Sequence, residues 1–572
     1  MKLHLFQSLA WCGICSLAWG QGAADRHPLY EPSVPQTKKV EIQGGLQVAV
    51  LSEFDRTELD KVPGTTQPAL KLRGWRGERV SGRLAAWSKG NEPQLTVNQP
   101  QLVNEEGDSI EAKTGMLRYT AAHGKLYADV IGNENVCDLA AGQTRSIWVQ
   151  VDIPQDAEPG VYRGSICVYS AASASQQIPF ELEVEDLELP EPADWNIYLD
   201  LWQHPQAVAR WHQVEPWSPE HMALLKPLMK RLADAGQKVV TCTIIDEAWN
   251  AQTYDWFPSL VRWVRGKDGV MRYDYSAFDT WVEFMMDEIG IKEQISCYTM
   301  VPWSMSVRYF DESTGVYLTK RLSIKDASFE QMWGPFLRDF RKHLKSKGWL
   351  EKTCIALDER PDALMLAAQD ALQKYAPELR IVSAVDRPSD TTRQVYLISP
   401  VVTHADSVTS EMLAERKANG KKTSFYVCLH PQHPNTFTMS PHAEAEWLGV
   451  FAAARGYDGF LRWAYNSWNR NPFENTDFVH WPSGDCYLVY PGNLSSRRFE
   501  HLRDGLEDYE KISILRARAK ELDTPEAGAA IERLNAELAS LFTVERSKGT
   551  QHEQDVLRAR ELIRETAAIL FR

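Results

Sequence analysis

Alternation between apolar and polar residues dominates the first third of the chain. Residues 147–153 read IWVQVDI and residues 180–184 read FELEV. Such a period of two predicts strands that have one buried and one solvated face. Turn residues separate these runs, as is typical of a sandwich of strands. We therefore predict a β-sandwich domain over residues 21–192, which ends in the proline-rich linker 189–192 because proline cannot continue a strand ladder.

From Trp195 onward, short continuous apolar runs alternate with helical patterns. Continuous runs are typical of strands that are buried on both faces, as in a parallel sheet. Serine-proline pairs at 218–219 and 440–441 predict two helix starts. Eight repeats over about 300 residues favour a (β/α)8 barrel over an open sheet. The predicted strands are residues 195–201, 238–245, 293–300, 353–359, 379–385, 394–399, 422–429 and 458–465.

The fifth connection, around residues 388–393, is too short for a full helix, so one repeat is predicted to be degenerate. The barrel is predicted to span residues 193–520 and to be followed by a helical extension over residues 521–572. Thr524-Pro525 is a helix start in this extension. Apolar residues at helical spacing follow it, and we interpret them as packing faces.

Charge and the N-terminus narrow the classes of function. The 572 residues include 63 lysines and arginines against 77 acidic residues, a net charge of -14, which argues against nucleic acid or an anionic membrane surface as the main partner. Lys2, an apolar run and Ala18-Trp19-Gly20 predict a signal peptide over residues 1–20, and hence an exported, periplasmic or secreted protein. Lipidation at Cys12 or Cys15 fits less well, because neither follows a small residue. No later apolar run is long enough to span a bilayer, and the oligomeric state stays open.

Candidate chemistry lies at the ends of the predicted strands, because barrels of this type carry their active sites there. Carboxylates ringed by tryptophan and tyrosine suit sugars, whose C–H faces stack on aromatic rings while their hydroxyls need polar partners. The predicted catalytic residues are Asp358 and Glu359. The predicted substrate-binding residues are Trp202, His204, Tyr298, Trp303, Asp386, His430, Trp463, Tyr465, Asn466 and Trp468.

Two adjacent acid pairs compete for the catalytic role, Asp246-Glu247 and Asp358-Glu359. Neighbouring strand residues point to opposite faces, so a pair can converge only where the backbone turns at the strand end. We favour the second pair, because it lies at an abrupt strand-to-helix boundary before Pro361 and because strand four commonly carries the acid/base residue in sugar-cleaving barrels. Asp200 and Asp246 could instead only cap the helices that follow them.

Other chemistries lack their usual signatures. His430 and His433 have loose metal-ligand spacing, but we find no convincing third ligand. The sequence has no glycine-rich phosphate loop and no G-x-S-x-G elbow. We therefore expect neither a metal nor an organic cofactor.

Four segments resemble bacterial proteins that carry domain of unknown function 4091, a group that includes glycoside hydrolase family 123, the β-N-acetylgalactosaminidases. These segments are residues 200–205 (DLWQHP), 357–359 (LDE), 459–466 (GFLRWAYN) and 503–509 (RDGLEDY). The resemblance implies hydrolysis with retention, in which the substrate's own 2-acetamido oxygen attacks the anomeric carbon. It implies that Glu359 is the general acid/base and that Asp358 holds the acetamido N–H. Repulsion between adjacent carboxylates is expected to raise the proton affinity of the less solvated one and to leave the other ionised.

Two alternatives stay open at this point. A glycosidase of the same fold could act on a sugar without an acetamido group, with Asp386 or Glu247 as its nucleophile. A glycan-binding protein without catalysis could also have kept the barrel, although the presence of both acids argues against this. Sugar specificity, linkage, exo or endo action and any sugar binding by the sandwich are not given by the sequence.

Overall fold

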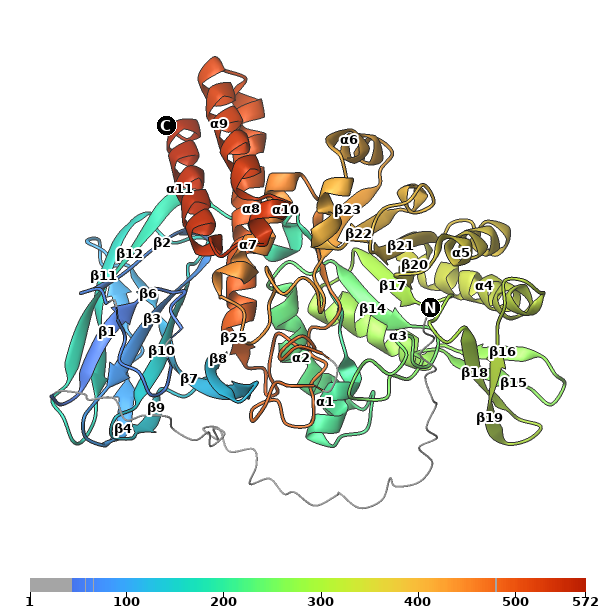
Figure 1. Cartoon of the computed structure of the whole chain (residues 1–572), viewed down its shortest axis with the longest axis horizontal. Coiled ribbons are helices and arrows are strands. Elements are labelled where there is room, and N and C mark those ends of the chain that lie inside the picture. Colours follow the sequence, from blue (N-terminus) through green and yellow to red (C-terminus); the bar gives the residue numbers. More distant parts are fainter. Residues whose placement is uncertain (1–43, 57, 65, 479–480) are drawn as a thin grey trace, which may run out of the picture.

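The structure is a computed structural model that describes residues 44–56, 58–64, 66–478 and 481–572. The predicted signal peptide, residues 1–20, lies outside the described residues. A strand-rich domain comes first and is followed by a domain of parallel strands and helices (Figure 1). Within the described part of the chain, no helix is both long enough and apolar enough to cross a membrane.

The N-terminal domain packs two sheets against each other around a core of buried aliphatic residues. The predicted alternation is present in β12 (Gln176–Glu188), where Phe180, Leu182 and Val184 are buried. The outward glutamates of β12 form ion pairs with Lys71 and Arg73 of β2 (Leu70–Arg76). The other strands are β1 (Gln47–Leu51), β3 (Arg79–Trp87), β4 (Glu92–Val97), β5 (Gln101–Val103), β6 (Ser109–Glu111), β7 (Lys113–Ala122), β8 (Lys125–Ile131), β9 (Val136–Leu139), β10 (Thr144–Asp152) and β11 (Gly160–Tyr169).

All eight predicted barrel strands are present, within a few residues of the predicted bounds, and each pairs in parallel with its neighbours. They are buried on both faces, as their apolar sequences predict. In chain order they are β13 (Tyr198–Leu201), β14 (Val239–Thr243), β17 (Gln294–Tyr298), β20 (Thr353–Asp358), β21 (Arg380–Val385), β22 (Leu397–Pro400), β23 (Lys422–Tyr426) and β24 (Gly459–Arg462). One bridge between Leu199 and Gln237 links β13 to the chain just before β14.

The fifth connection contains only a short 3-10 helix, Thr392–Gln394, as its length predicts. The degenerate repeat is therefore present as predicted, and the domain is a nearly closed eight-stranded parallel barrel with helices. The helices of the other connections are α1 (Pro205–His212), α2 (Pro219–Ala233), α3 (Ser276–Glu283), α4 (Ser328–Lys347), α5 (Asp362–Tyr375), α6 (Ser410–Ala418), α7 (Ala443–Arg455) and α8 (Arg497–Leu522).

Of the two serine-proline helix starts predicted in the barrel, one is confirmed and one is wrong. The Ser218 side chain accepts a hydrogen bond from the His221 amide and caps α2, which begins at Pro219. The Ser440-Pro441 pair does not start a helix. The Ser440 hydroxyl accepts from the Phe437 amide instead, and α7 begins only at Ala443.

A four-stranded sheet that the sequence analysis did not predict is inserted after β14 and β17. It is formed by β15 (Arg262–Arg265), β16 (Met271–Asp274), β18 (Ser306–Asp311) and β19 (Val316–Arg321), in the order β16-β15-β18-β19. In Figure 1 it lies at the lower right, below α4 and outside the ring of barrel strands. We call it the insertion sheet.

The C-terminal segment is helical, as its apolar spacing predicts. It consists of α9 (Pro525–Leu541), the short α10 (Val544–Ser547) and α11 (His552–Leu570). Thr524 caps α9 by accepting from the Ala527 amide. In Figure 1, α11 and α9 rise together with α8 between the sandwich and the barrel.

The two domains share a sheet and a buried ion pair. Strand β25 (Ser495–Ser496) comes just before α8 and pairs antiparallel with β8 of the sandwich. Two residues further on, Arg498 Nε lies 2.9 Å from Asp129 Oδ2, and both side chains are almost fully buried. The Tyr490 hydroxyl donates a third bond to this carboxylate, at 2.6 Å. The interface is therefore continuous with the interior of both domains.

We expect Asp129→Asn to lower the free energy of unfolding by about 3–5 kcal/mol, because it leaves the Arg498 guanidinium buried without its counter-charge. Urea unfolding at neutral pH measures the change. Glu288→Gln, which removes an exposed ion pair with Lys226 on the barrel surface, is the matched control and should cost less than about 1 kcal/mol. A loss for Asp129→Asn as small as the control's would contradict this role.

Candidate active site

The acid pair Asp358-Glu359 lies where β20 ends, at the C-terminal end of the barrel strands, which we call the barrel mouth. Asp358 is the last residue of β20, and Glu359 follows with a left-handed backbone, φ 51°. The Glu359 amide still donates to the Ala384 carbonyl of β21, at 3.0 Å. This turn brings both carboxylates to Tyr426 of β23, whose hydroxyl donates to Glu359 Oε1 and whose pKa is raised by burial and by both acids.

The two acids of this pair differ in exposure. Asp358 is half-buried, and burial together with the charge of Glu359 raises its pKa to about 7, while Trp303 and Arg360 oppose the shift. Glu359 is exposed. The less solvated acid, Asp358, has a raised pKa as expected, whereas the resemblance gives the role of proton donor to the exposed Glu359. The reason is geometric, because Asp358 still belongs to the strand while Glu359 turns outward.

A third carboxylate, Asp200, lies on β13 and is only 3% exposed. Burial raises its pKa to about 7, an effect that the nearby Trp202 side chain opposes. Its Oδ1 atom has no hydrogen-bond partner among the described residues. Asp200 also acts, with Asp358, on the pKa of the buried Tyr298, which is raised well above its usual value first of all by burial. Asp200 therefore does not cap the following helix, and it shares Tyr298 as a neighbour with Asp358.

Four of the predicted aromatic and histidine residues pack together beside these acids, with Trp249 and Phe257. The Trp202 ring centroid lies 4.5 Å from that of Tyr298 and 5.4 Å from that of Trp249. His204 lies 5.5 Å from Trp249 and 6.2 Å from Trp463. The indole nitrogens of Trp202 and Trp249 and the Nδ1 atom of His204 are buried without a partner among the described residues. Buried polar atoms usually have partners, so these unused groups could bind hydroxyls of a ligand.

His204 is neutral and held rigidly. Burial lowers its pKa to about 4, and its Nε2 atom lies 3.2 Å from the Trp463 carbonyl. Asn466 binds the His204 backbone on both sides, since its Oδ1 accepts from the amide at 2.9 Å and its Nδ2 donates to the carbonyl at 3.1 Å. Asn466 is fully buried, so it positions His204.

The remaining predicted residues do not all join this group. Tyr465 and Trp468 are buried and donate to the carbonyls of Leu228 and Val489, so they pack behind the mouth. Asp386 and His430 are exposed, and Asp386 pairs with His404. Trp303 is 43% exposed and lies beneath Arg360, 4.6 Å from its guanidinium carbon, so it does reach the acid pair.

Family models identify the family of the chain. The model of the glycoside hydrolase 123 catalytic domain matches residues 202–515, and that of the glycoside hydrolase 123 N-terminal domain matches residues 51–170. The chain belongs to glycoside hydrolase family 123. The catalytic match contains both acid pairs and most of the barrel-mouth residues named above.

A comparison with solved structures finds one of closely similar fold in the same family. A family 123 glycoside hydrolase from Clostridium perfringens, analysed for the details of glycolipid glycan hydrolysis, is 25% identical, with a TM-score of 0.85 over 92% of this chain and 99% of that chain. A family 39 glycoside hydrolase from Bacteroides cellulosilyticus is 11% identical, with a TM-score of 0.33 over 78% of this chain and 82% of its own. A comparison with curated protein sequences gives no match.

The second acid pair, Asp246-Glu247, forms hydrogen bonds and an ion pair within the protein. Asp246 accepts from the Ser259 amide at 2.8 Å and forms a 2.9 Å ion pair with Arg308. Glu247 accepts from the Phe257 amide at 2.6 Å, although burial raises its pKa. Both carboxylates thus hold the loop 246–259 in shape.

Three further residues at the mouth were not named by the sequence analysis. Tyr426 binds Glu359, Arg360 covers Trp303, and Asp485 accepts from the Trp463 indole at 3.1 Å. Asp485 also pairs with the buried Arg462, at 2.8 Å. Tyr426 ends β23, but the predicted strand ran on to residue 429, so the strand-end rule pointed past it to His430. Asp485 comes from a long loop that carries no such signal.

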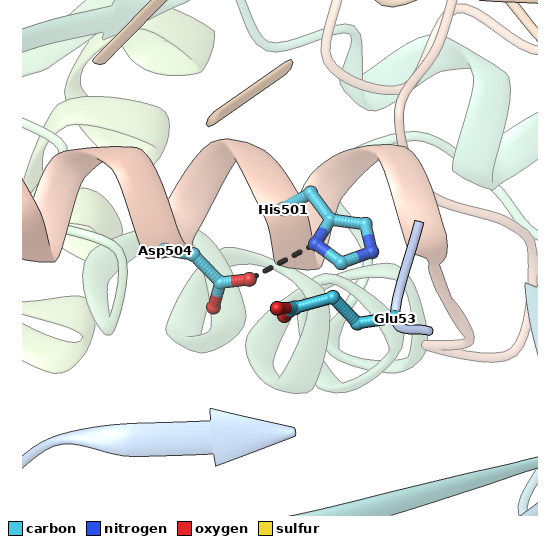
Figure 2. A group of neighbouring side chains, drawn as sticks. All are labelled: Glu53, His501 and Asp504. Carbon is cyan, nitrogen blue, oxygen red and sulfur yellow. Dashed lines mark hydrogen bonds and ion pairs between the residues drawn. The ribbon is translucent and has the colours of Figure 1, made fainter. Parts of the chain in front are cut away.

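Among the described residues, one group of acid and histidine side chains is close enough to hold a metal ion, and it lies away from the barrel mouth. Figure 2 shows Glu53 of the sandwich facing His501 and Asp504 of α8, whose Nδ1 and Oδ2 atoms are 3.0 Å apart. Arg560 of α11 forms 2.6 Å ion pairs with Glu53 and with Glu446. The Arg560 guanidinium thus already supplies a positive charge to these acids, and we assign Glu53, His501 and Asp504 to the packing of the two domains. Asp504 belongs to the segment 503–509, one of the four on which the family resemblance was based.

His433 and His430 do not form a metal site with each other. His433 Nδ1 lies 2.6 Å from Glu444 Oε1 on α7, a contact that raises the pKa of His433, and His430 is exposed. His433 therefore has a carboxylate partner of its own.

Asp200→Asn should stabilise the protein at pH 8 and lower its glycosidase activity. The native pKa of about 7 lies above the ordinary value of 3.8, so wild-type stability is lost as pH rises from about 4 to 7. The variant does not lose this stability, so at pH 8 its free energy of unfolding should exceed that of the wild type by at most about 4 kcal/mol. Near pH 4 the two free energies should be equal. Urea unfolding at both pH values measures it. Asp246→Asn, whose carboxylate is paired, should not stabilise at either pH, and a destabilised Asp200→Asn at pH 8 would refute the unpaired state.

Proposed function

We propose that this family 123 enzyme is a retaining β-N-acetylgalactosaminidase that uses the substrate's 2-acetamido group as nucleophile. The observation that carries the proposal is the pair of adjacent acids at the end of β20, with Tyr426 bound to the outer one. Two acids on one strand end do not flank a sugar from opposite faces, as a two-carboxylate retaining site requires. Export, expected from residues 1–20, and action on glycans outside the cytoplasm are part of the proposal.

Each acid has a distinct task in this mechanism. The acetamido oxygen attacks the anomeric carbon as Glu359 gives its proton to the leaving oxygen, and the carbon–oxygen bond breaks. Asp358 accepts the acetamido N–H and stabilises the positive charge of the oxazolinium ion that forms. Glu359, now a carboxylate, takes a proton from water as that water attacks the same carbon. The configuration is retained because the carbon is inverted twice.

The raised pKa of Asp358 is compatible with these tasks. The free pair can hold one proton near neutral pH, and this proton lies on Asp358 because that acid is less solvated. An acetamido N–H at Asp358 favours its carboxylate form, so the proton moves to Glu359 when substrate binds. The Tyr426 hydroxyl orients the Glu359 carboxyl for the transfer.

One observation favours the two-carboxylate rival. Asp200 is buried and its Oδ1 atom has no partner among the described residues, so it is better suited as a nucleophile than Asp386, which is exposed, or Glu247, which is bound by Phe257. We give Asp200 the role of binding a sugar hydroxyl, because a carboxyl with a pKa of about 7 is partly protonated and is a weak nucleophile at neutral pH.

Glu359→Gln should lower kcat on a glycoside with a poor leaving group by about 10²–10⁴-fold, because the leaving oxygen is no longer protonated. An aryl glycoside with a strongly acidic phenol should lose much less in its first step. Steady-state and burst kinetics on the two substrates measure the contrast. Glu288→Gln, which changes an exposed glutamate on the barrel surface, is the control and should keep activity within about twofold. Near wild-type turnover of the poor leaving group would remove Glu359 from the mechanism.

N-acetylgalactosamine-thiazoline, a mimic of the bicyclic intermediate, should inhibit competitively and bind at least about 10²-fold tighter than substrate. Asp358→Asn should weaken this inhibition and lower turnover together, because the same carboxylate holds the nitrogen in both complexes. Aryl β-GalNAc, β-GlcNAc and β-Gal compared side by side give the sugar preference. Efficient hydrolysis of the β-galactoside without inhibition by the thiazoline would contradict the proposal and favour a two-carboxylate mechanism with Asp200 as nucleophile.

A further inference from the structure

The insertion sheet carries exposed aromatic residues and an unusual charge. Trp256, in the loop that leads to β15, is 55% exposed, and Tyr317 of β19 is 47% exposed. Strands β15, β16, β18 and β19 with their two hairpin turns contain seven lysines and arginines against four acidic residues, although the chain as a whole has a net charge of -14. The sheet is thus a local positive surface on an acidic protein.

Arg308 of β18 is the centre of this surface. Its guanidinium carbon lies 3.9 Å from the Tyr317 ring centroid and 5.6 Å from that of Trp256. One nitrogen of the guanidinium forms the 2.9 Å ion pair with Asp246, and the Arg308 side chain is 37% exposed. Stacking and the ion pair fix the orientation of the guanidinium, and the side chain is still partly open to solvent.

The surface is linked to the barrel mouth through the loop 246–259. Trp256 is the neighbour of Phe257, whose ring centroid lies 4.7 Å from that of Trp249 and 5.2 Å from that of His204. Asp246 and Glu247 hold this loop in shape through Ser259 and Phe257. The loop therefore joins the aromatic group of the mouth to the insertion sheet.

We propose that Trp256, Arg308 and Tyr317 form an acceptor subsite that binds the part of a glycan beyond the cleaved bond, and that Arg308 recognises a sulfate or carboxylate on it. This inference rests on the proposed glycosidase function and names its substrate class. Aromatic faces stack on sugar rings, and a fixed guanidinium fork matches the oxygens of a sulfate or carboxylate. The net negative charge elsewhere makes this sheet the place where an anionic sugar is attracted.

The test compares three substrates: an aryl β-N-acetylgalactosaminide, a neutral oligosaccharide with a terminal β-N-acetylgalactosamine, and the same oligosaccharide sulfated on the next sugar. Arg308→Gln should lower kcat/KM about tenfold for the sulfated oligosaccharide and less than about twofold for the neutral one. Trp256→Ala should lower kcat/KM for both oligosaccharides at least about fivefold more than for the aryl glycoside. The sulfate preference of the wild type should shrink as salt rises.

Arg272→Gln is the matched control, because Arg272 lies on the same sheet and pairs with Asp268 away from Trp256. It should leave the ratio between the two oligosaccharides unchanged. Equal losses for the sulfated and neutral substrates in Arg308→Gln would overturn anion recognition. Binding of the wild type to vesicles of phosphatidylglycerol and phosphatidylcholine, abolished by Trp256→Ala, would overturn the subsite in favour of a membrane-binding surface.

Calorimetric binding of both oligosaccharides to the Glu359→Gln protein gives a readout that needs no turnover. Tighter binding of the sulfated sugar, lost on adding Arg308→Gln, supports the subsite. Equal binding of the two sugars overturns it. If the wild type hydrolyses none of the three substrates, the proposed function is wrong, and the calorimetric result still decides the question of anion recognition.

Discussion

The buried ion pair between Arg498 and Asp129 is the interaction on which the geometry of the barrel mouth depends. Besides Asp129, the Arg498 guanidinium donates to the carbonyls of Thr436, Gly484 and Tyr487, at 2.8–3.0 Å. The first carbonyl belongs to the loop after β23 and the other two to the loop after β24. The second of these loops also contains Asp485, which holds the Trp463 indole. An aspartate of the sandwich therefore fixes, through one arginine, the loops that carry part of the site. The sandwich acts on catalysis by support, without needing to touch the substrate.

The two acid pairs show how environment assigns roles to identical dipeptides. In each, the aspartate ends or follows a strand and the glutamate has a left-handed backbone with φ 51°. Asp246 has an arginine and an amide as partners, and it holds a loop. Asp358 has no such ion pair, so burial and its neighbour keep its proton affinity high. The sequence favoured the second pair by its strand-to-helix boundary and by analogy of fold, but it could not show the partner that neutralises the first. The difference arises from Arg308, which is more than sixty residues away from Asp246 in the chain.

The barrel strands were predictable because burial on both faces leaves continuous apolar runs, and the missing helix was predictable from the length of its connection. The insertion sheet was not, because its strands of four to six residues carry arginines and tyrosines on exposed positions. The strand-end rule found the acids and the aromatic group. It could not separate Trp202, which lies among the acids, from Tyr465 and Trp468, which pack behind them, since side-chain direction after a strand end depends on loop geometry. It also could not rank the solvation of Asp358 and Glu359.

The pairing of β25 with β8 has a consequence for how the chain is made. Residues Val130 and Ile131 at the edge of the sandwich sheet find their partners at Ser496 and Ser495, more than 360 residues later. On a ribosome, the first domain emerges long before the segment that completes its sheet, and domains generally fold in the order in which they are synthesised. Until then this end of β8 has an open edge, which is the kind of surface that pairs with other chains. The sheet is completed only when residues 495–496 have been synthesised.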